Sequence, residues 1–285
     1  MSGSTGNVLD AFRLDDRVAI VTGSGRGIGA ETAKVFAEVG ARVVCVARTA
    51  EQIAATVAQI ESVGGEGLAV ACDLTDPEAG DRVVAATVER FGGVDLLVNN
   101  AGGGGHMPTK YAADEHFEAA IGLNFRAPFY LTRAVAPHMQ ARGDGAVVNI
   151  SSGFSRAANV GSIPYGGAKA ALEQMTRMMA MEYAPEVRVN AIRVGAVTTE
   201  NMRENLLARN PGIGEKLEAW TPRARLGEPR DIALAALYLC SPAADYVTAR
   251  ILPVDGGVVL ERSATEIIDR AERLAEEGAA ERSEP

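Results

Sequence analysis

Residues 18–29 read VAIVTGSGRGIG, and they set the architecture that the rest of the chain follows. Val18 to Val21 form a short apolar run typical of a buried β-strand, and apolar residues from Ile28 to Val39 recur at helical spacing. A glycine-rich turn lies between them. Glycines let the backbone approach a pyrophosphate closely, and the N-terminus of a helix supplies free N–H donors. A strand, this turn and a helix in this order therefore predict nucleotide binding.

The same alternation of apolar runs and helical periods continues to about residue 260. Further strands are predicted at residues 43–46, 68–70, 94–98, 146–150, 187–192 and 250–254. Helices are predicted from a Thr49/Gln52 capping box to Ile60, from Asp76-Pro77, from Asp114 to Gln140 and from Ile163 to Tyr183. Because the strands are apolar throughout and helices separate them, we expect a parallel sheet covered on both faces. The predicted fold class is α/β, a single doubly wound Rossmann domain with a seven-stranded parallel sheet.

Two segments flank this domain, which spans residues 14–260. Residues 1–13 form an N-terminal arm, and residues 261–285 form an acidic C-terminal helical tail. In the tail, Ser263 and Glu266 make a capping box, and an apolar stripe runs from Ile267 to Leu274. We expect a helix there that either frays in solvent or docks on a neighbouring subunit.

The composition excludes several classes of protein. The chain has 285 residues, a net charge of −9 and a pI near 5.0, so no nucleic-acid-binding surface is expected. No apolar run approaches the ~20 residues of a membrane span, and the N-terminus lacks the pattern of a secretion signal. The three cysteines and three histidines are too scattered for a disulfide framework or a metal site. We therefore expect a cytoplasmic protein with buried free thiols and no bound metal.

Tyr165 and Lys169 stand four residues apart in a predicted helix, so they share one face. With six tyrosines and four lysines in the chain, chance produces this spacing roughly 0.1 times. A lysine ammonium beside the phenol is expected to lower its pKa from about 10, and the tyrosine can then exchange a proton with a carbonyl or alcohol oxygen. Ser152 ends a predicted strand and is placed to donate a hydrogen bond to the same oxygen.

Taken in order, these motifs resemble the short-chain dehydrogenase/reductase family over roughly residues 14–260. The resemblance rests on the turn Thr22-Gly23-x-x-x-Gly27-Ile28-Gly29, on Asn99-Asn100-Ala101-Gly102, on Ser152, Tyr165 and Lys169, on residues 194–199, and on Asp255-Gly256-Gly257. Residues 99–105 and 235–244 resemble 7-alpha-hydroxysteroid dehydrogenases in particular. Val194 departs from the family's pattern, which has proline at that position.

The resemblance implies hydride transfer between a nicotinamide cofactor and an alcohol or ketone. It implies that the catalytic residues are Asn124, Ser152, Tyr165 and Lys169, with Asn124 holding a water that relays protons to Lys169. The implied cofactor contacts are Gly23, Ser24, Arg26, Gly27, Ile28, Gly29, Arg48, Thr49, Asp73, Leu74, Asn100, Ala101, Gly102, Tyr165, Lys169, Gly195, Val197 and Thr199. The implied substrate contacts are Ser152, Tyr165, Gly195 and Met202.

The cofactor is expected to be NADP(H) rather than NAD(H). The family's NAD-linked steroid dehydrogenases carry aspartate where this chain has Ala47, and a carboxylate there repels a 2′-phosphate. Arg48 follows, and its planar guanidinium suits a phosphate. Arg26 in the glycine turn can approach from the other side. The alternative interpretation is that Arg48 is merely solvated and that Arg26 only caps the turn.

Three segments are expected to wall a substrate pocket at the carboxyl ends of the strands, residues 103–107, 153–164 and 196–220. The third carries Met202, Leu206, Leu207, Leu217 and Trp220, which form either an apolar lid or an ordinary amphipathic helix pair. A small, steroid-like or otherwise apolar hydroxy or keto compound suits an apolar lid, and His106 is expected to be solvated. The resemblance also implies a homotetramer or homodimer built on the long helices around Asn124 and Tyr165.

Other functions make different demands on the sequence. A methyltransferase also uses a glycine-rich first loop, but it has no role for Ser152, Tyr165 and Lys169. A catalytically silent dinucleotide-binding scaffold would not need these three residues either. The alternative enzyme is a 3-oxoacyl-[acyl-carrier-protein] reductase, whose acidic partner would require a local basic patch. The candidates for that patch are Arg133, Arg142, Arg203 and Arg209.

Overall fold

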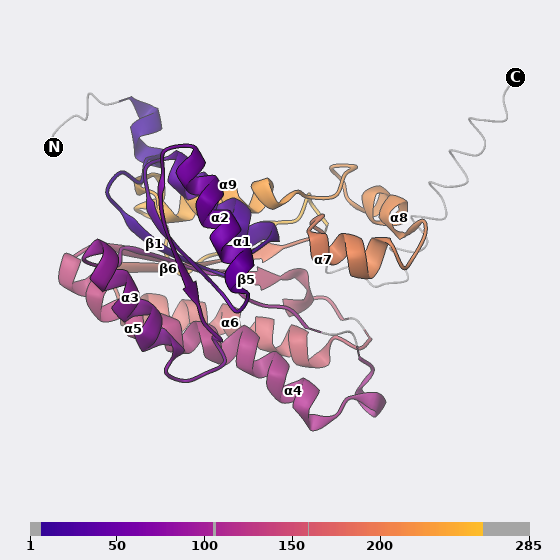
Figure 1. Cartoon of the computed structure of the whole chain (residues 1–285). Helices are drawn as coiled ribbons and strands as arrows, with labels where there is room; N and C mark the ends of the chain where they lie inside the picture. Colours follow the sequence, from indigo (N-terminus) through magenta and orange to yellow (C-terminus); the bar gives the residue numbers. More distant parts are fainter. Residues whose placement is uncertain (1–6, 105–106, 159, 259–285) are drawn as a thin grey trace, which may run out of the picture.

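The chain forms one doubly wound α/β domain, as the sequence predicts, in a computed structural model that describes residues 7–104, 107–158 and 160–258 (Figure 1). Its strands are β1 (Val18–Thr22), β2 (Arg42–Ala47), β3 (Glu66–Ala71), β4 (Leu96–Asn99), β5 (Gly145–Ser152), β6 (Val187–Val194) and β7 (Ile251–Val254). They form a seven-stranded sheet in the order β3-β2-β1-β4-β5-β6-β7. Every pairing is parallel.

Helices cover both faces of this sheet, because side chains alternate between the faces along each strand. Ala19 and Val21 of β1 pack into a core with α1 (Gly27–Glu38), α2 (Ala50–Ser62) and α9 (Pro229–Cys240). Val18 and Ile20 pack on the opposite face with α3 (Ala79–Phe91), α5 (Ala127–Arg142) and α6 (Ile163–Glu182). Figure 1 shows these two layers above and below the strands.

The remaining helical segments lie beyond the carboxyl ends of the strands or beside the two layers. They are α4 (Asp114–Ile121), α7 (Glu200–Met202), α8 (Ile213–Trp220) and two π-helical segments, Gly122–Arg126 and Arg203–Leu207. Short 3-10 turns span Val8–Phe12, Thr109–Tyr111, Gly153–Ser155 and Pro242–Ala244. The first of these turns belongs to the predicted N-terminal arm and contacts the last of them.

The strand order reverses at β1, which lies between β2 and β4. In an open parallel sheet, a crevice forms outside the carboxyl ends of the strands at such a switch point. The glycine turn after β1 and the segment Asn100–Gly102 after β4 both begin at this edge. The register pairs Val21 of β1 with both Cys45 of β2 and Val98 of β4, so these strand ends lie level.

The structure corrects four details of the sequence-based prediction. The helix expected from Asp114 to Gln140 is interrupted by the π-helical segment, whose wider turn follows from the polar contacts of Asn124 described below. The Thr49/Gln52 capping box is absent, because the Gln52 side chain packs against Gly25 of the glycine turn instead. Helix α3 begins at Ala79 rather than at Asp76-Pro77, because the Asp76 carboxylate accepts from the Glu78 N–H and forms a turn first.

The fourth correction concerns strand β3, which is not apolar throughout. It lies at the edge of the sheet, and three of its six residues, Glu66, Ala69 and Ala71, are exposed, whereas the other three are half-buried. The three cysteines are buried and free, as expected. Burial raises the pKa of the Cys45 thiol to about 11. The predicted tail helix and its Ser263/Glu266 capping box lie outside the described residues.

Candidate active site

The glycine turn after β1 is shaped for close approach by a ligand. Gly23 and Gly27 have φ angles of +62° and +58°, in the left-handed region that favours glycine. A side chain at Gly29 would place its Cβ 2.3 Å from the Gly23 carbonyl oxygen, so only glycine fits there. The turn leads directly into α1, whose first N–H groups face the crevice at the switch point. The residues present therefore fit the pyrophosphate of a dinucleotide.

Two side chains tie this turn to the end of β4. The Asn100 amide Nδ2 donates to the carbonyl oxygens of Thr22 (2.8 Å) and Gly23 (3.2 Å). In return, the Thr22 hydroxyl accepts from the backbone N–H groups of Asn100 and Ala101, both at 2.9 Å. These bonds join the carboxyl ends of β1 and β4 and hold the glycine turn in one conformation.

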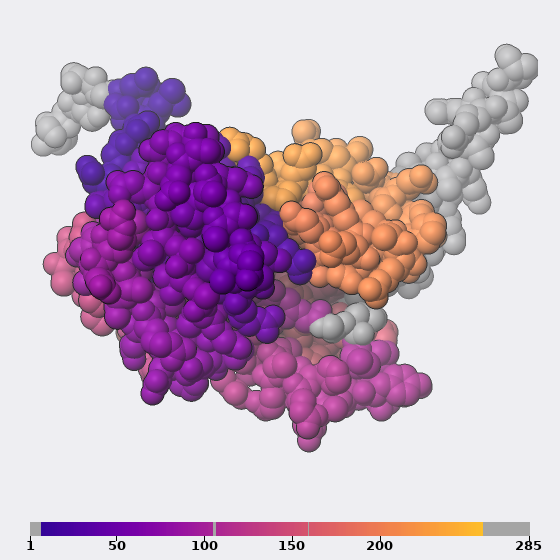
Figure 2. Space-filling model, viewed as in Figure 1, coloured from indigo at the N-terminus to yellow at the C-terminus, as the bar shows by residue number. Residues whose placement is uncertain are grey.

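A cleft of about 1720 Å³ opens at this edge of the sheet. Figure 2 shows the surface hollowed between the orange segment with α7 and α8 and the magenta segment with α4. Most residues predicted to contact cofactor or substrate line it. They are Gly23, Arg26, Gly27, Ile28, Arg48, Thr49, Asp73, Leu74, Asn100, Ala101, Gly102, Ser152, Tyr165, Lys169, Gly195, Val197, Thr199 and Met202.

Three predicted site residues do not line the cleft. Ser24 is fully buried, and its carbonyl oxygen accepts from the Thr56 hydroxyl at 2.9 Å, so this residue anchors the glycine turn to α2. Gly29 is buried against Gly23 and serves the packing of α1 on the turn. Asn124 is fully buried behind the cleft wall.

Asn124 holds the loop after β4 from within the π-helical segment. Its Nδ2 donates to the carbonyl oxygens of Gly103 (2.8 Å) and Ala120 (2.9 Å), and its Oδ1 accepts from the Gly103 N–H (3.0 Å). A Cβ on Gly102 would lie 2.8 Å from Asn124 Oδ1 and 3.0 Å from Lys169 Nζ. The amide and the ammonium therefore face each other across Gly102. π-helical turns of this kind occur frequently at functional sites.

Ser152, Tyr165 and Lys169 come together on the opposite wall. Ser152 ends β5, whereas Tyr165 and Lys169 occupy successive turns of α6. Lys169 Nζ donates to the Ile150 carbonyl oxygen at 2.8 Å and lies 5.8 Å from the centroid of the Tyr165 ring. The Ser152 side chain lies near enough to the Tyr165 phenol to act on its pKa, which it lowers. The structure thus brings together three of the four residues that the sequence assigns to chemistry, with the fourth next to Lys169.

Burial dominates the electrostatics of this group. It raises the pKa of Tyr165 above its ordinary value, and the Ser152 side chain opposes that shift only in part. Burial also lowers the pKa of Lys169 to about 8. The sequence-based expectation that Lys169 lowers the pKa of Tyr165 is wrong for this structure. The reason is that the ammonium is directed at the Ile150 carbonyl and is itself desolvated, so it does not offset the burial of the phenol.

The adenosine side of the cleft carries two exposed arginines. Arg48 follows Ala47 at the carboxyl end of β2, and its charge contributes to lowering the pKa of Asp73, a shift that comes mainly from hydrogen bonds donated by Thr75. Arg26 precedes α1, and its Nη1 lies 3.9 Å from the Glu204 carboxylate. Arg26 is therefore partly neutralised by the segment that follows α7, whereas no ion pair engages Arg48 among the described residues.

The walls expected around a substrate pocket are found in the cleft, and they are mainly apolar. Its lining includes Met107, Phe154, Pro164, Met202, Leu206, Leu217 and Trp220. Trp220 and Leu217 belong to α8 and line the cleft. Figure 1 shows α8 beside α7. His106 lies outside the described residues.

The arginines expected to form an acidic-partner patch are not gathered in one place. Arg142, at the end of α5, pairs with Asp95 just before β4, at the amino ends of the strands. Arg203 and Arg209 lie beyond the carboxyl end of β6, on the side of the cleft. Arg133 stacks on the rings of Phe129 and Tyr130 on α5.

Two polar residues behind the site escaped the sequence analysis, Glu173 and Arg193. They form a buried ion pair with Nη2 and Oε2 2.6 Å apart. The spacing of Tyr165, Lys169 and Glu173 at four-residue intervals is a signal that places Glu173 on the same helix face. Nothing in the sequence around Arg193 indicates that its side chain turns toward that helix.

Comparison with known proteins places this architecture in a family. A family model described as enoyl-(acyl carrier protein) reductase matches residues 23–259, most of the chain. The chain belongs to the short-chain dehydrogenase/reductase family. The chain is 41% identical over 252 residues to an uncharacterized oxidoreductase of Mycobacterium tuberculosis. The match covers 88% of this chain and 95% of the relative.

A second short-chain relative has an assigned reaction. The chain is 40% identical over 253 residues to the 7α-hydroxysteroid dehydrogenase of Escherichia coli K12, covering 88% of this chain and 98% of that enzyme. A solved 7α-hydroxysteroid dehydrogenase in complex with NADH and 7-oxo glycochenodeoxycholic acid superposes with a TM-score of 0.86 at 39% identity, over 90% of this chain and 99% of that one. The protein is thus an oxidoreductase, and the methyltransferase and scaffold alternatives are excluded.

The glycine turn agrees with this assignment. The family uses NAD(P)(H) on alcohol and ketone groups, and the glycine turn fits such a dinucleotide. Within the described residues, no helix has the length and apolar character needed to cross a membrane. The same part of the chain contains no cluster of three metal-binding side chains.

The low pKa of Lys169 predicts how stability depends on pH. In the folded protein Lys169 loses its proton near pH 8, whereas the unfolded chain keeps it to about pH 10.5. Between these values the unfolded state binds more protons, so the free energy of unfolding rises with pH, by at most about 3 kcal/mol. We expect Lys169→Met to lack this rise when urea unfolding is measured from pH 7 to 9.5.

Lys216→Met is the matched control, because Lys216 is exposed on α8. Its unfolding free energy should follow that of the wild type at every pH. A constant difference between wild type and Lys169→Met across this range would contradict the lowered pKa.

Proposed function

We propose that this protein is an NADP(H)-dependent oxidoreductase that interconverts a secondary alcohol and a ketone, with Tyr165 as the general acid and base. One observation carries the proposal: Ser152, Tyr165 and Lys169 meet in the same cleft as the glycine turn. A proton donor and a dinucleotide site on one cleft are what carbonyl reduction requires. When bound, the nicotinamide supplies the hydride to the carbonyl carbon or accepts it from the alcohol.

The chain's own residues handle the proton. In the reducing direction, the Tyr165 hydroxyl gives its proton to the carbonyl oxygen, and the Ser152 hydroxyl donates a hydrogen bond to that oxygen as negative charge develops. The raised pKa of Tyr165 keeps the phenol protonated at neutral pH, which suits this direction. Lys169 supplies positive charge near the tyrosinate that remains. In the oxidising direction the same groups act in reverse.

Asn124 is proposed to help return the proton. Its Oδ1 faces Lys169 Nζ across Gly102, as described above. A water held between these two atoms would connect the ammonium to the polar end of the loop after β4. Asn124 also fixes that loop through Gly103, so its replacement is expected to affect both the proton path and the shape of the cofactor site.

The substrate is proposed to be a small, apolar hydroxy or keto compound, such as a steroid-like molecule. The apolar side chains of Met107, Phe154, Met202, Leu217 and Trp220 in the lining of the cleft support this, because they offer an apolar substrate a surface to pack on. The relative from E. coli is named for a steroid substrate. A 3-oxoacyl-[acyl-carrier-protein] reductase remains the alternative, and the matching family model is described by a different reaction, enoyl reduction, on the same type of carrier. The dispersed arginines weigh against it.

The preference for NADP(H) is proposed from the residues at the end of β2. Ala47 is uncharged and occupies the position where an NAD-selecting carboxylate would lie. The exposed Arg48 guanidinium next to it suits a 2′-phosphate. Arg26 contributes less, because Glu204 lies 3.9 Å from it. Three buried, unpaired cysteines fit a protein that works in the reducing cytoplasm.

Tyr165→Phe tests the proton donor. We expect turnover to fall by a factor on the order of 10²–10⁴, as for the loss of a positioned acid, with NADPH affinity nearly unchanged. The assay follows NADPH oxidation with a panel that includes 7-oxo glycochenodeoxycholic acid, a 3-oxoacyl thioester and simple ketones. Tyr246→Phe is the matched control, since Tyr246 is fully exposed. Near-normal turnover in Tyr165→Phe would refute the mechanism.

The cofactor preference has its own test, kcat/KM for NADPH and for NADH. A hydrogen bond to a charged group contributes about 1.5–3 kcal/mol, so the wild type should prefer NADPH by about 10- to 150-fold. Ala47→Asp combined with Arg48→Ile should reverse the preference, because it removes an attraction and adds a repulsion. Glu204→Gln, which frees Arg26, should leave the preference for NADPH equal or larger. A wild-type preference for NADH would overturn the argument from Arg48.

Assembly into a homotetramer or homodimer is proposed from the exposed apolar side chains on the long helices. Phe117 of α4, Phe129 of α5, and Met178 and Met181 of α6 are between 38% and 79% exposed. Light scattering at micromolar concentration should give the mass of a dimer or tetramer, and a monomer would contradict the proposal. Deletion from Ser263 onward tests separately whether the tail docks on a neighbouring subunit, since docking predicts a loss of stability.

A further inference from the structure

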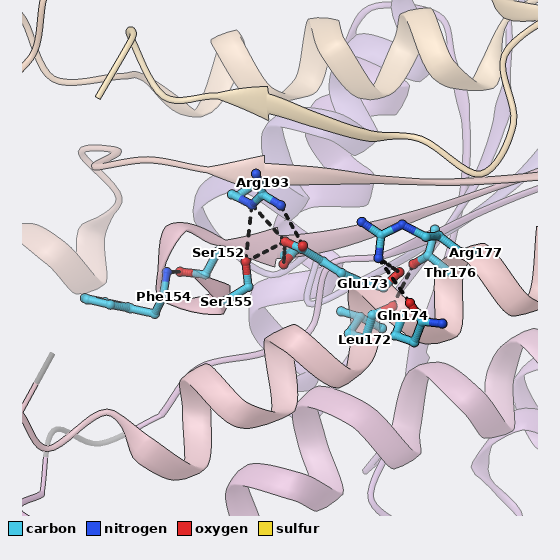
Figure 3. Close-up of polar contacts among 10 residues, drawn as sticks. Ser152, Phe154, Ser155, Leu172, Glu173, Gln174, Thr176, Arg177 and Arg193 are labelled. Atoms are coloured by element: carbon cyan, nitrogen blue, oxygen red, sulfur yellow. Dashed lines mark hydrogen bonds and ion pairs between the residues drawn. The ribbon is translucent and has the colours of Figure 1, made fainter. Parts of the chain in front are cut away.

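Behind the catalytic wall, one buried carboxylate gathers four hydrogen bonds (Figure 3). Glu173 accepts from the Ser151 hydroxyl (2.9 Å), the Ser155 hydroxyl (2.6 Å), Arg193 Nε (2.9 Å) and Arg193 Nη2 (2.6 Å). Arg193 Nε also lies 3.2 Å from the Ser155 hydroxyl. We call these four residues, Ser151, Ser155, Glu173 and Arg193, the Glu173 network. Of these four residues, Ser151 lines the cleft, whereas Ser155, Glu173 and Arg193 lie behind its wall.

The network encloses the residue proposed to polarise the substrate. Ser151 precedes Ser152 on β5, and Ser155 ends the 3-10 turn that Ser152 begins. Glu173 therefore holds the chain on both sides of Ser152. The Ser152 side-chain hydroxyl accepts one hydrogen bond from the backbone, from the Phe154 N–H at 3.3 Å. The orientation of its hydroxyl thus depends on how firmly the turn is fixed.

The same network sets the turn against the helix that carries Tyr165 and Lys169. Glu173 lies one helical turn beyond Lys169 and two beyond Tyr165, so the three share a face of α6. Phe154 of the turn packs edge-on to the Tyr165 ring, with centroids 6.1 Å apart. Any movement of the turn relative to α6 would change the distance between the Ser152 and Tyr165 hydroxyls.

Arg193 stabilises the buried Glu173 carboxylate in its charged form. Burial alone would raise the pKa of Glu173, but hydrogen bonds from Arg193, Ser155 and Ser151 bring it below its usual value. Arg193 pairs in register with Ser151 across the β5–β6 ladder, so it reaches the network from the neighbouring strand. A buried ion pair is seldom more stabilising than apolar residues of the same size. The value of this pair therefore lies in the geometry it imposes.

We propose that Glu173 and Arg193 are positioning residues that fix the Ser152 hydroxyl against Tyr165 for hydrogen bonding to the carbonyl oxygen. This inference rests on the proposed function, because it assigns the network a role in that reaction. A misplacement of about 1 Å can cost about 10²-fold in rate. We expect loss of the network to lower kcat by about 10- to 100-fold with KM for NADPH changed less than twofold.

Two variants, one that weakens the network and one that removes its ion pair, avoid leaving a lone buried charge. Ser155→Ala deletes one hydroxyl donor and keeps the ion pair, and kcat should fall about 3- to 10-fold. Glu173→Leu combined with Arg193→Met replaces the ion pair by apolar side chains of similar size, and here the full loss is expected. Arg177→Ala is the matched control, because Arg177 lies one turn further along α6, is exposed and bonds only Glu173 O and Gln174.

A double-mutant cycle with Ser152→Ala separates positioning from general stability. If the network acts through Ser152, its removal should change kcat less than twofold once Ser152 is already alanine. Kinetics use NADPH and the ketone of the panel that the wild type reduces fastest. Equal fold-losses in both backgrounds, or no loss in either, would overturn the proposal.

Amide hydrogen exchange provides a readout that does not depend on turnover. In both network variants, the amides of residues 153–156 should exchange at least tenfold faster than in the wild type, while the amides of β1 should exchange at the wild-type rate. In Arg177→Ala, the amides of residues 153–156 should also exchange at the wild-type rate. Unchanged exchange at residues 153–156 would also overturn the proposal. If exchange changes as expected but the wild type reduces no carbonyl, the proposed function fails and the positioning role fails with it, while the conformational effect of the network stands.

Discussion

One face of helix α6 packs toward the sheet and carries Tyr165, Lys169 and Glu173. The chemistry of the site depends on the partners that these three side chains find. Unpaired buried charges are costly, so each must find a partner in the strands below. Lys169 donates to the Ile150 carbonyl, and Glu173 is held by Arg193 and two serines. Burial raises the pKa of the Tyr165 phenol, and Ser152 opposes that shift in part. These partners come from the carboxyl ends of β5 and β6 and from the turn that follows β5, so one contact between α6 and this edge of the sheet organises the wall that carries Tyr165 and Lys169.

The opposite wall is built by the same rule from different elements. The conformation of the glycine turn after β1 is fixed by hydrogen bonds that Asn100, at the end of β4, donates to its carbonyl oxygens. The loop that follows β4 is in turn held by Asn124, whose π-helical setting gives its amide access to Gly103. The two walls meet at Gly102, where Asn124 and Lys169 approach each other. The proposed cofactor site and the proposed proton path thus share their supports.

The sequence was sufficient to predict a seven-stranded parallel sheet, and most of the site residues that it predicted line the cleft. Apolar runs mark buried strands, and the Tyr165/Lys169 spacing marks a shared helix face, since both depend on local periodicity. Features that depend on tertiary contacts were not predictable. The π-helical turn at Asn124 arises from a loop distant in sequence, and Gln52 left its expected cap because it packs on Gly25. The pKa of Tyr165 was predicted in the wrong direction, because its burial is invisible in the sequence.

In the proposed mechanism, Tyr165 and Ser152 together hold the carbonyl oxygen of the substrate. The most direct test is a crystal structure with NADP⁺ and the ketone that the wild type reduces fastest. The carbonyl oxygen should lie within hydrogen-bond reach of both hydroxyls, about 2.6–3.2 Å. A ketone bound in the cleft with its oxygen directed away from Tyr165 and Ser152, toward other donors, would contradict it.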